Sequence, residues 1–388
     1  MNRPVIIDAV RTPFGKRGGA LSHWRPDSLL AHTVQGILKR SGLEGDHVDD
    51  LIAGCVTQAG EQGGNVARQA ALLAGLPIHV PGVTLNRMCG SGQTAVHMAA
   101  QAVAAGDAGY AIGGGVESMS RVPMFVDVTL GPAFTDWQSL NPDLLARHEL
   151  PHQGISAEYV AQHWGLTRAE LDAYAMESHR RAHMAAQAQH HKEIVGIDIT
   201  IEGAKQTLCR DEGIRTALSQ EKMASLQPIF DPEHGIITAG NASQMTDGAA
   251  AVLVGNEERA RADGLPVKAR FLARVTLGSD PRMQLDGILP ATRKALKTAG
   301  LDLTDIDWIE VNEAFACVPL AWSREFGVEH DRFNQWGGAI AHGHPLGATG
   351  AGLIAKTLSG LEATDGTLGL IVFCVGHGMA TATIVERC

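Results

Sequence analysis

Apolar and polar positions alternate between two patterns along the first third of the chain. Short apolar runs have the length of buried strands, and the stretches between them repeat apolar residues at helical spacing. The strand-like runs cover residues 5–10, 51–56, 83–86 and 108–113, and the helical stretches cover 29–40 and 66–74. Strands that alternate with helices are typical of α/β proteins with a mostly parallel sheet. The pattern therefore predicts an α/β fold of this kind.

The middle of the chain interrupts this pattern. From about residue 120 to about residue 239 the sequence carries many prolines, several charge clusters and much of the histidine, with helical segments at 157–163 and 171–187. Strand-like runs then return at 249–254, 269–275, 308–311, 368–375 and 381–385. We expect an inserted segment followed by a second α/β half, although no residue-level repeat between the halves is evident.

Length and composition agree with a globular protein of more than one domain. The chain has 388 residues, of which 45% are hydrophobic and 19% charged, which is ordinary for a folded protein and unlike a disordered one. No apolar stretch approaches the length of about 18 residues that spans a membrane, and the first apolar run contains Asp8. We expect a cytoplasmic protein with no membrane segment.

Charge and cysteine content exclude two further classes of protein. The net charge of −10 argues against nucleic-acid binding, which needs a basic surface to displace counterions. Any anionic ligand must therefore meet local positive charge. The six cysteines form no C-x-x-C pair, so we predict reduced thiols and neither a disulfide framework nor a zinc ribbon.

Cys89 is the first candidate for chemistry. It lies in residues 86–92 (NRMCGSG), which end an apolar run and precede a helical stretch at 93–105. A helix start favours a thiolate over a thiol, and we expect it to lower the pKa of Cys89. Gly90 and Gly92 leave room for a substrate. The alternative is a buried structural cysteine.

A second candidate segment, residues 337–350, holds His342 and His344 in a glycine-rich loop before an apolar helix at 351–358. A neutral imidazole close to a thiol can take its proton, which is why cysteine and histidine recur together in covalent catalysis. The alternative is a histidine that only caps its own loop. Zinc binding would need further ligands that the sequence does not offer, so no metal site is predicted.

Two more segments carry polar groups just beyond strand-like runs. In residues 372–378, Cys374 could serve as a general acid or base, and Gly376 offers an unobstructed backbone N–H to an oxyanion. In residues 310–316, Asn312 could orient a water molecule or donate to an oxyanion. Taken singly, each of these segments also fits a structural role.

Two other patterns favour ordinary explanations. His179 and His183 have the spacing of metal ligands on a helix, but Arg180 and Arg181 between them indicate a solvated face. The triple glycine at 113–115 lacks the G-x-G-x-x-G spacing of a dinucleotide site, and we expect a tight turn there.

Taken together and in order along the chain, these segments resemble the thiolase family, and the resemblance covers essentially the whole sequence. It is carried by the Cys89, Asn312, His344 and Cys374 segments and by residues 10–15, 54–56, 117–120, 238–243 and 247–250. The resemblance implies a five-layered αβαβα sandwich of two similar halves. It further implies an N-terminal half at 1–119 and 240–262, a loop domain at 120–239 that covers coenzyme A, and a C-terminal half at 263–388.

The resemblance also implies roles for the candidate residues. Cys89 resembles the nucleophile that accepts the acyl group, His344 the base that activates it, and Cys374 the acid or base that exchanges a proton with the substrate's α-carbon. His344 and a water held by Asn312 resemble one oxyanion hole, and the backbone N–H groups of Cys89 and Gly376 the other. Two holes suit the chemistry, because a thioester oxygen becomes anionic both in the enolate and in the tetrahedral adduct.

The implied ligand is coenzyme A, as a substrate rather than a permanently bound cofactor, together with its thioesters. His152, Ser243, Ala314 and Phe315 match family positions along the pantetheine channel, and Arg215 matches a position near the adenine nucleotide. The resemblance implies a homodimer or homotetramer.

The choice within the family depends on departures from its pattern. Gln153 stands where many short-chain biosynthetic members have methionine, and His377 and Ala380 stand in a turn that is commonly richer in glycine. His377 either tunes Cys374 or points away from it. Other segments look closer to degradative thiolases, including those that handle bulky steroid-derived chains.

We therefore expect a degradative 3-ketoacyl-CoA thiolase whose acyl specificity depends on the loops between residues 125 and 152. The alternatives are an acetyl-CoA acetyltransferase that runs in the condensing direction and a non-catalytic relative that binds acyl-CoA or lipid.

Overall fold

One ten-stranded sheet, whose two halves are joined at a narrow seam, forms the framework of the described part of the molecule. The computed structural model describes residues 2–131, 139–201 and 203–388, so residues 132–138 of the predicted specificity region lie outside it. The strands run in the order β10-β11-β12-β9-β1-β8-β5-β3-β4, and β2 pairs with β8 beside this path. Their bounds are β1 (Pro4–Arg11), β2 (Gly15–Lys16), β3 (Asp50–Gly54), β4 (Gly82–Leu85), β5 (Tyr110–Ser118), β8 (Thr246–Asn256), β9 (Ala269–Gly278), β10 (Trp308–Val311), β11 (Leu368–Val375) and β12 (Met379–Arg387).

The seam between β1 and β9 is narrow, and the strand order repeats on either side of it. Only Val5 with Arg270 and Ile6 with Ala269 pair across it. The order β3-β5-β8-β1 on one side matches β10-β11-β12-β9 on the other, with the same parallel and antiparallel pairs. The repeat that is not evident in the residues is therefore present in the topology.

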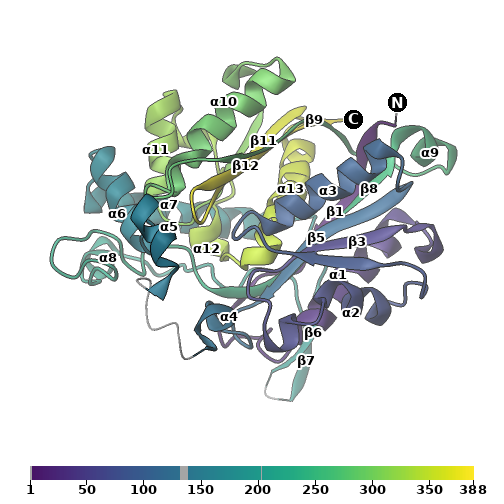
Figure 1. The fold of residues 1–388 in the computed structure, drawn as a ribbon, viewed down its shortest axis with the longest axis horizontal. Coiled ribbons are helices and arrows are strands. Elements are labelled where there is room, and N and C mark those ends of the chain that lie inside the picture. Colours follow the sequence, from purple (N-terminus) through teal and green to yellow (C-terminus); the bar gives the residue numbers. More distant parts are fainter. Residues whose placement is uncertain (1, 132–138, 202) are drawn as a thin grey trace.

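Helices complete five layers (Figure 1). The helix α3 (Ser91–Ala105) and the helix α13 (Leu346–Thr364) pack on each other between the two halves of the sheet, and the outer layers are α1 (Pro26–Ser41) with α2 (Val66–Leu73) and α10 (Ile288–Ala299) with α11 (Cys317–Phe326). A helix covered on all sides must be apolar all round, and residues 347–361 of α13 are buried throughout. The predicted αβαβα sandwich is confirmed.

The expected predominance of parallel strands is wrong. Three strand pairs of the large sheet are parallel and six are antiparallel. The strands β11 and β12 are joined by a turn at residues 376–378, and so short a connection forces antiparallel pairing. The strand β8 follows the long inserted segment, which can return the chain in either direction. Hydrophobic spacing carries no information on strand direction.

The expected tight turn at the triple glycine is also wrong, because Gly113, Gly114 and Gly115 lie inside β5. Their lack of side chains serves close packing. A Cβ on Gly113 would lie 2.6 Å from Val96 Cα in α3, and one on Gly115 would collide with the carbonyl oxygen of Gly347 in α13. The glycines therefore let both central helices approach this strand.

The segment between β5 and β8 forms a mostly helical lobe. It contains α4 (Val126–Thr129), α5 (Pro142–Arg147), α6 (Gln153–His163), α7 (Arg168–Gln187), the hairpin β6 (Ile197–Ile201) and β7 (Ala204–Leu208), and α8 (Gln220–Ala224). Val160 and Leu171 of this lobe share a core with Trp322 and Phe333 of the C-terminal part, which fixes α6 and α7 against it. The short helices α9 (Glu257–Ala262) and α12 (Ala339–His342) complete the described elements.

Over the described ranges, none of the helices combines the length and the apolarity needed to cross a bilayer.

Candidate active site

Cys89 lies in the turn between β4 and α3, two residues before the helix begins. Side chains of the turn itself hold this geometry. The Ser91 hydroxyl donates to the Met88 carbonyl at 2.6 Å and accepts from the Arg87 N–H at 2.8 Å. The Asn86 carboxamide oxygen accepts from the Met88 N–H at 2.8 Å. The sulfur is thereby held at the start of a central helix.

The state of this thiol differs from the sequence expectation. Cys89 is 5% exposed. Burial raises the pKa of its thiol to about 11, although hydrogen bonds from the Gln153 side chain and the Gly376 N–H favour the thiolate. The expected lowering of this pKa is wrong for the free enzyme, because lost hydration outweighs the helix start. At neutral pH the thiol is therefore protonated, so the nucleophile needs a base.

His344 is such a base. Its Nδ1 lies 2.7 Å from the Thr349 hydroxyl, which itself donates to the Pro345 carbonyl at 2.8 Å. The hydroxyl can therefore only accept from the ring, which places the proton on Nδ1 and leaves Nε2 as an acceptor. Nε2 is buried and has no partner among the described residues. Burial lowers the pKa of His344 to about 4, so the ring is neutral at pH 7.

Cys374 is the last residue but one of β11, and it is completely buried. Burial raises the pKa of its thiol well above the usual value, and a charge on Cys89 would raise it further, while the Ala314 N–H acts in the opposite sense. Cys374 is thus a neutral thiol that can give up a proton only to a strong base close by.

Asn312 directly follows β10, where its own N–H donates to the Val372 carbonyl at 2.9 Å. Its carboxamide is 1% exposed, and neither the nitrogen nor the oxygen has a partner within the part of the chain that is described. An unpaired buried amide is costly unless something else fills its hydrogen bonds. The group is therefore available to hold a water molecule or a ligand oxygen.

One cavity of about 710 Å³ joins these parts. Cys89 and His344 both line it. Cys374, Gly376 and Asn312 are not among the lining residues. Gly376 and Cys374 each act on the Cys89 sulfur or are acted on by it, and the Ala314 N–H that acts on Cys374 belongs to a lining residue. Asn312 is joined to β11 through the Val372 carbonyl, two residues before Cys374. The structure therefore brings Cys89, His344, Cys374 and Gly376 together and places Asn312 just after the strand next to that of Cys374.

The same cavity is lined by all five residues predicted to bind the cofactor, namely His152, Arg215, Ser243, Ala314 and Phe315. Aromatic rings form one wall. The His152 ring stacks on Phe230 with centroids 5.1 Å apart, and Phe230 meets Phe315 edge-on at 5.9 Å. The Ser243 N–H donates to the Ala314 carbonyl at 2.9 Å, which joins the two chain segments that contribute these lining residues. The channel is thus apolar and largely preformed, as ligand sites usually are.

This cavity has positively charged lining residues although the net charge of the chain is negative. Lys16, Arg17 and Arg215 all line it. Glu212, the one acidic residue among the described residues that line the cavity, accepts hydrogen bonds from the Lys16 N–H at 3.2 Å and the Ala20 N–H at 3.0 Å. Three cations against one occupied carboxylate suit an anionic ligand such as a phosphate ester.

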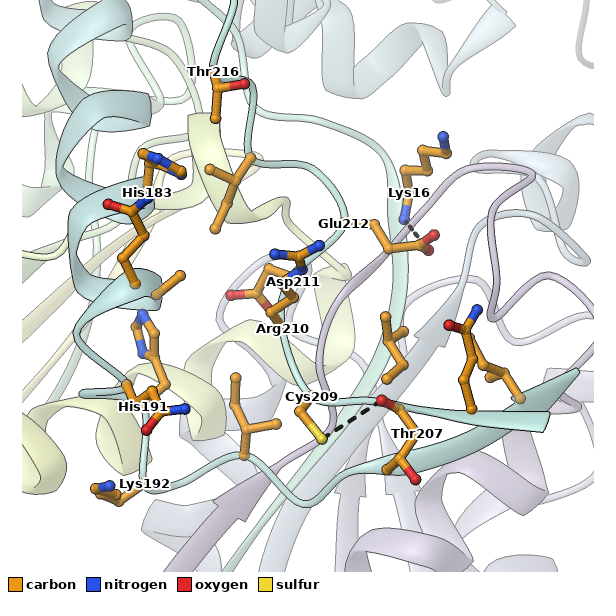
Figure 2. Close-up of a pocket in the computed structure, with 18 residues that line it drawn as sticks. Lys16, His183, His191, Lys192, Thr207, Cys209, Arg210, Asp211, Glu212 and Thr216 are labelled. Atoms are coloured by element: carbon orange, nitrogen blue, oxygen red, sulfur yellow. Dashed lines mark hydrogen bonds between the residues drawn. The ribbon is translucent and has the colours of Figure 1, made fainter. Parts of the chain in front are cut away.

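A second cavity of about 1020 Å³ lies on the other side of the loop at residues 210–216. Figure 2 shows Asp211 and Glu212 of this loop, with His183 and His191 across the cavity from them. Lys16 and Glu212 line both cavities. Of the described residues that line the second cavity, none carries a predicted role.

A buried ion-pair cluster anchors the loop at 210–216. Arg11 donates to Asp211 at 2.6 and 3.1 Å and to Glu193 at 3.1 Å. The Asp211 carboxylate also accepts from the Phe14 N–H at 2.8 Å. Through this cluster, the loop that carries Arg215 is fixed to β1.

His179 holds the loop that carries Arg215, a contact that the sequence pattern missed. It was expected on a solvated face, but it is 3% exposed, and its Nδ1 accepts from the Arg215 N–H at 3.0 Å. Packing of α7 against the Arg215 loop overrides the charged neighbours in the sequence. No group of three or more His, Cys, Asp or Glu within residues 2–131, 139–201 and 203–388 is placed to hold a metal ion.

Gln244 and Glu117 are two further positioning residues that local patterns do not indicate. The side-chain amide of Gln244 donates to the carbonyls of Gly213 and Ala341 at 2.9 and 3.0 Å. The backbone carbonyl of Gln244 accepts from the His344 N–H at 2.9 Å. The buried Glu117 accepts from the Gly347 N–H at 2.9 Å, near the start of α13. Both hold the His344 segment in place.

His377 is exposed and adopts φ 63° in the turn after β11. Its N–H donates to the Gln284 side chain at 2.8 Å. The residue thus helps to fix the turn that carries Gly376.

Comparison with known proteins gives two family matches that together span nearly the whole chain. "Thiolase, N-terminal domain" matches residues 4–258, and "Thiolase, C-terminal domain" matches residues 265–387.

Similar proteins cover the chain from end to end. A protein of Mycobacterium tuberculosis named steroid 3-ketoacyl-CoA thiolase FadA6 is 44% identical over 100% of this chain and 95% of its own length. A 3-ketoacyl-CoA thiolase of Vibrio cholerae is 42% identical over 100% of both chains. The crystal structure of the Bacillus anthracis acetyl-CoA acetyltransferase superposes with a TM-score of 0.91 at 34% identity, over 100% of this chain and 99% of that one.

Proposed function

The chain belongs to the thiolase family, and from this premise we propose that it is a degradative 3-ketoacyl-CoA thiolase. It converts a 3-ketoacyl-CoA and free CoA into acetyl-CoA and an acyl-CoA shortened by two carbons. One observation carries the proposal: His344 lines the same cavity as Cys89 and has a neutral ring whose buried Nε2 has no partner among the described residues, and a second thiol, Cys374, lies near enough to Cys89 to be affected by its charge.

In the first half of the reaction, His344 Nε2 takes the proton of Cys89, and the thiolate attacks the 3-keto carbon of the substrate. The new oxyanion accepts from the backbone N–H groups of Cys89 and Gly376. The bond between C2 and C3 then breaks, and its electron pair forms the enolate of acetyl-CoA. Cys374 protonates that enolate, whose oxygen is stabilised by protonated His344 and a water on Asn312.

In the second half, free CoA enters as a thiol, loses its proton to the Cys374 thiolate and attacks the acyl group on Cys89. The thioester bond to Cys89 breaks, the shortened acyl-CoA leaves, and the proton on His344 returns to the sulfur. Each group thereby regains its starting state, and the covalent intermediate predicts ping-pong kinetics.

Coenzyme A is the substrate carrier in this scheme and not a resident cofactor. Its pantetheine arm lies along His152, Ser243, Ala314 and Phe315, and its nucleotide lies near Arg215. The aromatic wall of the cavity and its three cationic lining residues, Lys16, Arg17 and Arg215, support this placement. In this division of the chain, residues 120–239 form the loop domain over CoA, 1–119 with 240–262 form one half, and 263–388 form the other.

The condensing acetyl-CoA acetyltransferase is the second candidate, because the same residues catalyse both directions and concentrations set the net direction. The name of the Bacillus anthracis neighbour favours it, whereas the names of the two more similar relatives favour degradation. A chain-length series of 3-ketoacyl-CoA substrates separates the two. Activity confined to acetoacetyl-CoA would support the acetyltransferase.

The covalent role of Cys89 is tested by substitution. Cys89→Ala should abolish thiolysis, because no other cysteine is among the described residues that line the cavity with His344. Wild-type protein incubated with an acyl-CoA should gain the acyl mass on the Cys89 peptide. Cys209→Ala, at an exposed thiol, is the matched control and should retain full activity. Measurable thiolysis by Cys89→Ala would refute the enzymatic proposal, as would release of free acid instead of a CoA ester.

We also propose a homodimer, itself able to pair into a tetramer. The strand β4 ends the sheet path and pairs with β3 on one side. Large apolar side chains are exposed beside it: Leu72, Leu73, Ile78 and Val83. An exposed apolar edge strand invites pairing with a second chain.

A further inference from the structure

Gln153 is a polar residue of the cavity to which the scheme above assigns no task. It is the first residue of α6, in the inserted segment, and lines the cavity together with Cys89. His152, just before it, caps the helix by accepting the Gly154 N–H at 3.1 Å. The helix start and the packed His152 ring hold the base of the Gln153 side chain in a fixed position.

The amide end of Gln153 lies beside the oxyanion hole. A Cβ built on Gly376 would lie 3.9 Å from Gln153 Nε2, with no closer polar side chain. The same Cβ would lie 3.5 Å from the side chain of Met88, the residue before Cys89, so the Gln153 amide and the Cys89 turn both adjoin Gly376. Hydrogen bonding by the Gln153 side chain and the Gly376 N–H opposes the rise that burial causes in the pKa of the Cys89 thiol. Three separate parts of the chain thus meet around Cys89: the start of α3, the turn after β11 and the start of α6.

We propose that Gln153 is a further catalytic residue, whose amide N–H donates to the Cys89 sulfur and stabilises it whenever it carries negative charge. This inference rests on the role proposed above for Cys89. The sulfur is anionic just before it attacks and again when the acyl group leaves, but not in the thioester between. A donor aimed at the sulfur therefore acts more strongly near both transition states than in the intermediate.

The other buried thiols support this role by comparison. Cys317 is also buried, but no side chain among the described residues donates to its sulfur, and burial together with the charge of Glu158 raises its pKa further than that of Cys89. The groups that act on the Cys89 sulfur include no cation. Neutral N–H donors are thus one of the differences between this thiol and a buried structural one.

The test is the rate at which Cys89 is alkylated by iodoacetamide between pH 7 and pH 9.5, followed on the Cys89 peptide by mass spectrometry. Gln153→Met fills the same space without a donor. Loss of a charge-assisted hydrogen bond should raise the thiol pKa by about one to two units. Since a more basic thiolate is also more nucleophilic, alkylation should slow by about three- to tenfold at every pH.

Two further variants make the outcome decisive. Gln153→Leu also removes the donor and should slow alkylation to the same extent, so the inference stays testable if one variant does not fold. Gln162→Met makes the same substitution at an exposed position of α6 and should match the wild type. Thiolysis by the Gln153 variants should show a lower kcat with a nearly unchanged KM for CoA.

Folded Gln153 variants that are alkylated at the wild-type rate would overturn the inference. Alkylation involves no CoA ester, so this result would leave the proposed function standing. Conversely, acyl transfer that persists without Cys89 would refute the function whatever the alkylation rates are.

Discussion

At the scale of single residues, the site consists of neutral groups whose roles depend on hydrogen bonds one step away. Burial keeps both thiols protonated and the imidazole uncharged. None of these three groups is ionised in the resting enzyme, so the reaction must move a proton before it can start. Thr349, whose hydroxyl is hydrogen-bonded to His344 Nδ1, sets the direction of that proton transfer, because it leaves Nε2 as the acceptor.

Thr349→Val tests this control of the tautomer. Without the hydroxyl, Nδ1 loses its acceptor and the ring can carry its proton on Nε2, which then cannot accept from Cys89. We expect kcat to fall by about tenfold to a hundredfold, the usual effect of losing such a partner. Thr298→Val is the matched control, because Thr298 also donates to the carbonyl four residues earlier, but at an exposed position. Equal activity of the two variants would contradict the assigned tautomer.

Residue patterns predicted where the reactive groups lie but not their ionisation. The Cys89 turn could be predicted because a strand, two glycines and a helix are all visible in the local sequence. Its pKa could not, because the burial that raises it and the Gln153 and Gly376 donors that oppose the rise depend on segments far along the chain. The same limit applies to His179. Its neighbours in the sequence are charged, but in the folded protein it is packed against other residues and shielded from solvent.

At the scale of elements, the structure ties the loop with Arg215 to the framework at several points. Arg11 from β1, His179 from α7 and Gln244 before β8 each contact the segment at 211–215. Burial opposes the charge on Asp211, yet the Arg11 guanidinium keeps the pKa of that carboxyl below its ordinary value. The loop therefore depends on a charge pair that is stable at neutral pH.

Asp211→Asn should weaken both the fold and the binding of CoA. Removing one charge from a buried pair costs about 3 kcal/mol in the free energy of unfolding. KM for CoA should rise severalfold while kcat changes little, because Arg215 shifts but Cys89 does not. Asp198→Asn, at an exposed position on β6, is the control. Urea unfolding and steady-state kinetics measure the two effects.

The same variant has a definite pH dependence. Because the folded pKa of Asp211 is lower than its unfolded value, the pair stabilises fully above the unfolded pKa of about 4. That stability is lost as the pH falls through the lower, folded pKa. The gap in unfolding free energy between wild type and variant should therefore be constant from pH 6 to 8 and shrink in acid. A gap that grows toward low pH would contradict the assignment.

Element positions followed from the sequence better than element directions. The strand at 308–311 and the strand at 368–375 were predicted with the observed bounds. The triple glycine was misassigned because a glycine that opens a turn and one that admits a neighbouring helix look alike in sequence. Only the collision of a Cβ at Gly113 or Gly115 with α3 or α13 separates the two cases.

At the scale of the whole molecule, the exposed edge at β4 predicts self-association. Val83→Lys places a charge on that edge, and charged edge strands resist pairing. Light scattering after gel filtration should give a multiple of 41.0 kDa for the wild type and a lower mass for the variant. Met184→Lys, at an exposed apolar residue of α7, should leave the mass unchanged. A wild type of 41.0 kDa would refute the dimer.

The matching strand order on the two sides of the seam has an evolutionary consequence. Cys89 and His344 precede α3 and α13, which occupy equivalent places in the two halves. A tandem duplication of one ancestral unit would at first have set the same residue at both helix starts. Nucleophile and base could then diverge, each copy keeping one task. A single unit expressed alone would hold either partner without the other, so this chemistry belongs to the pair and to neither ancestor.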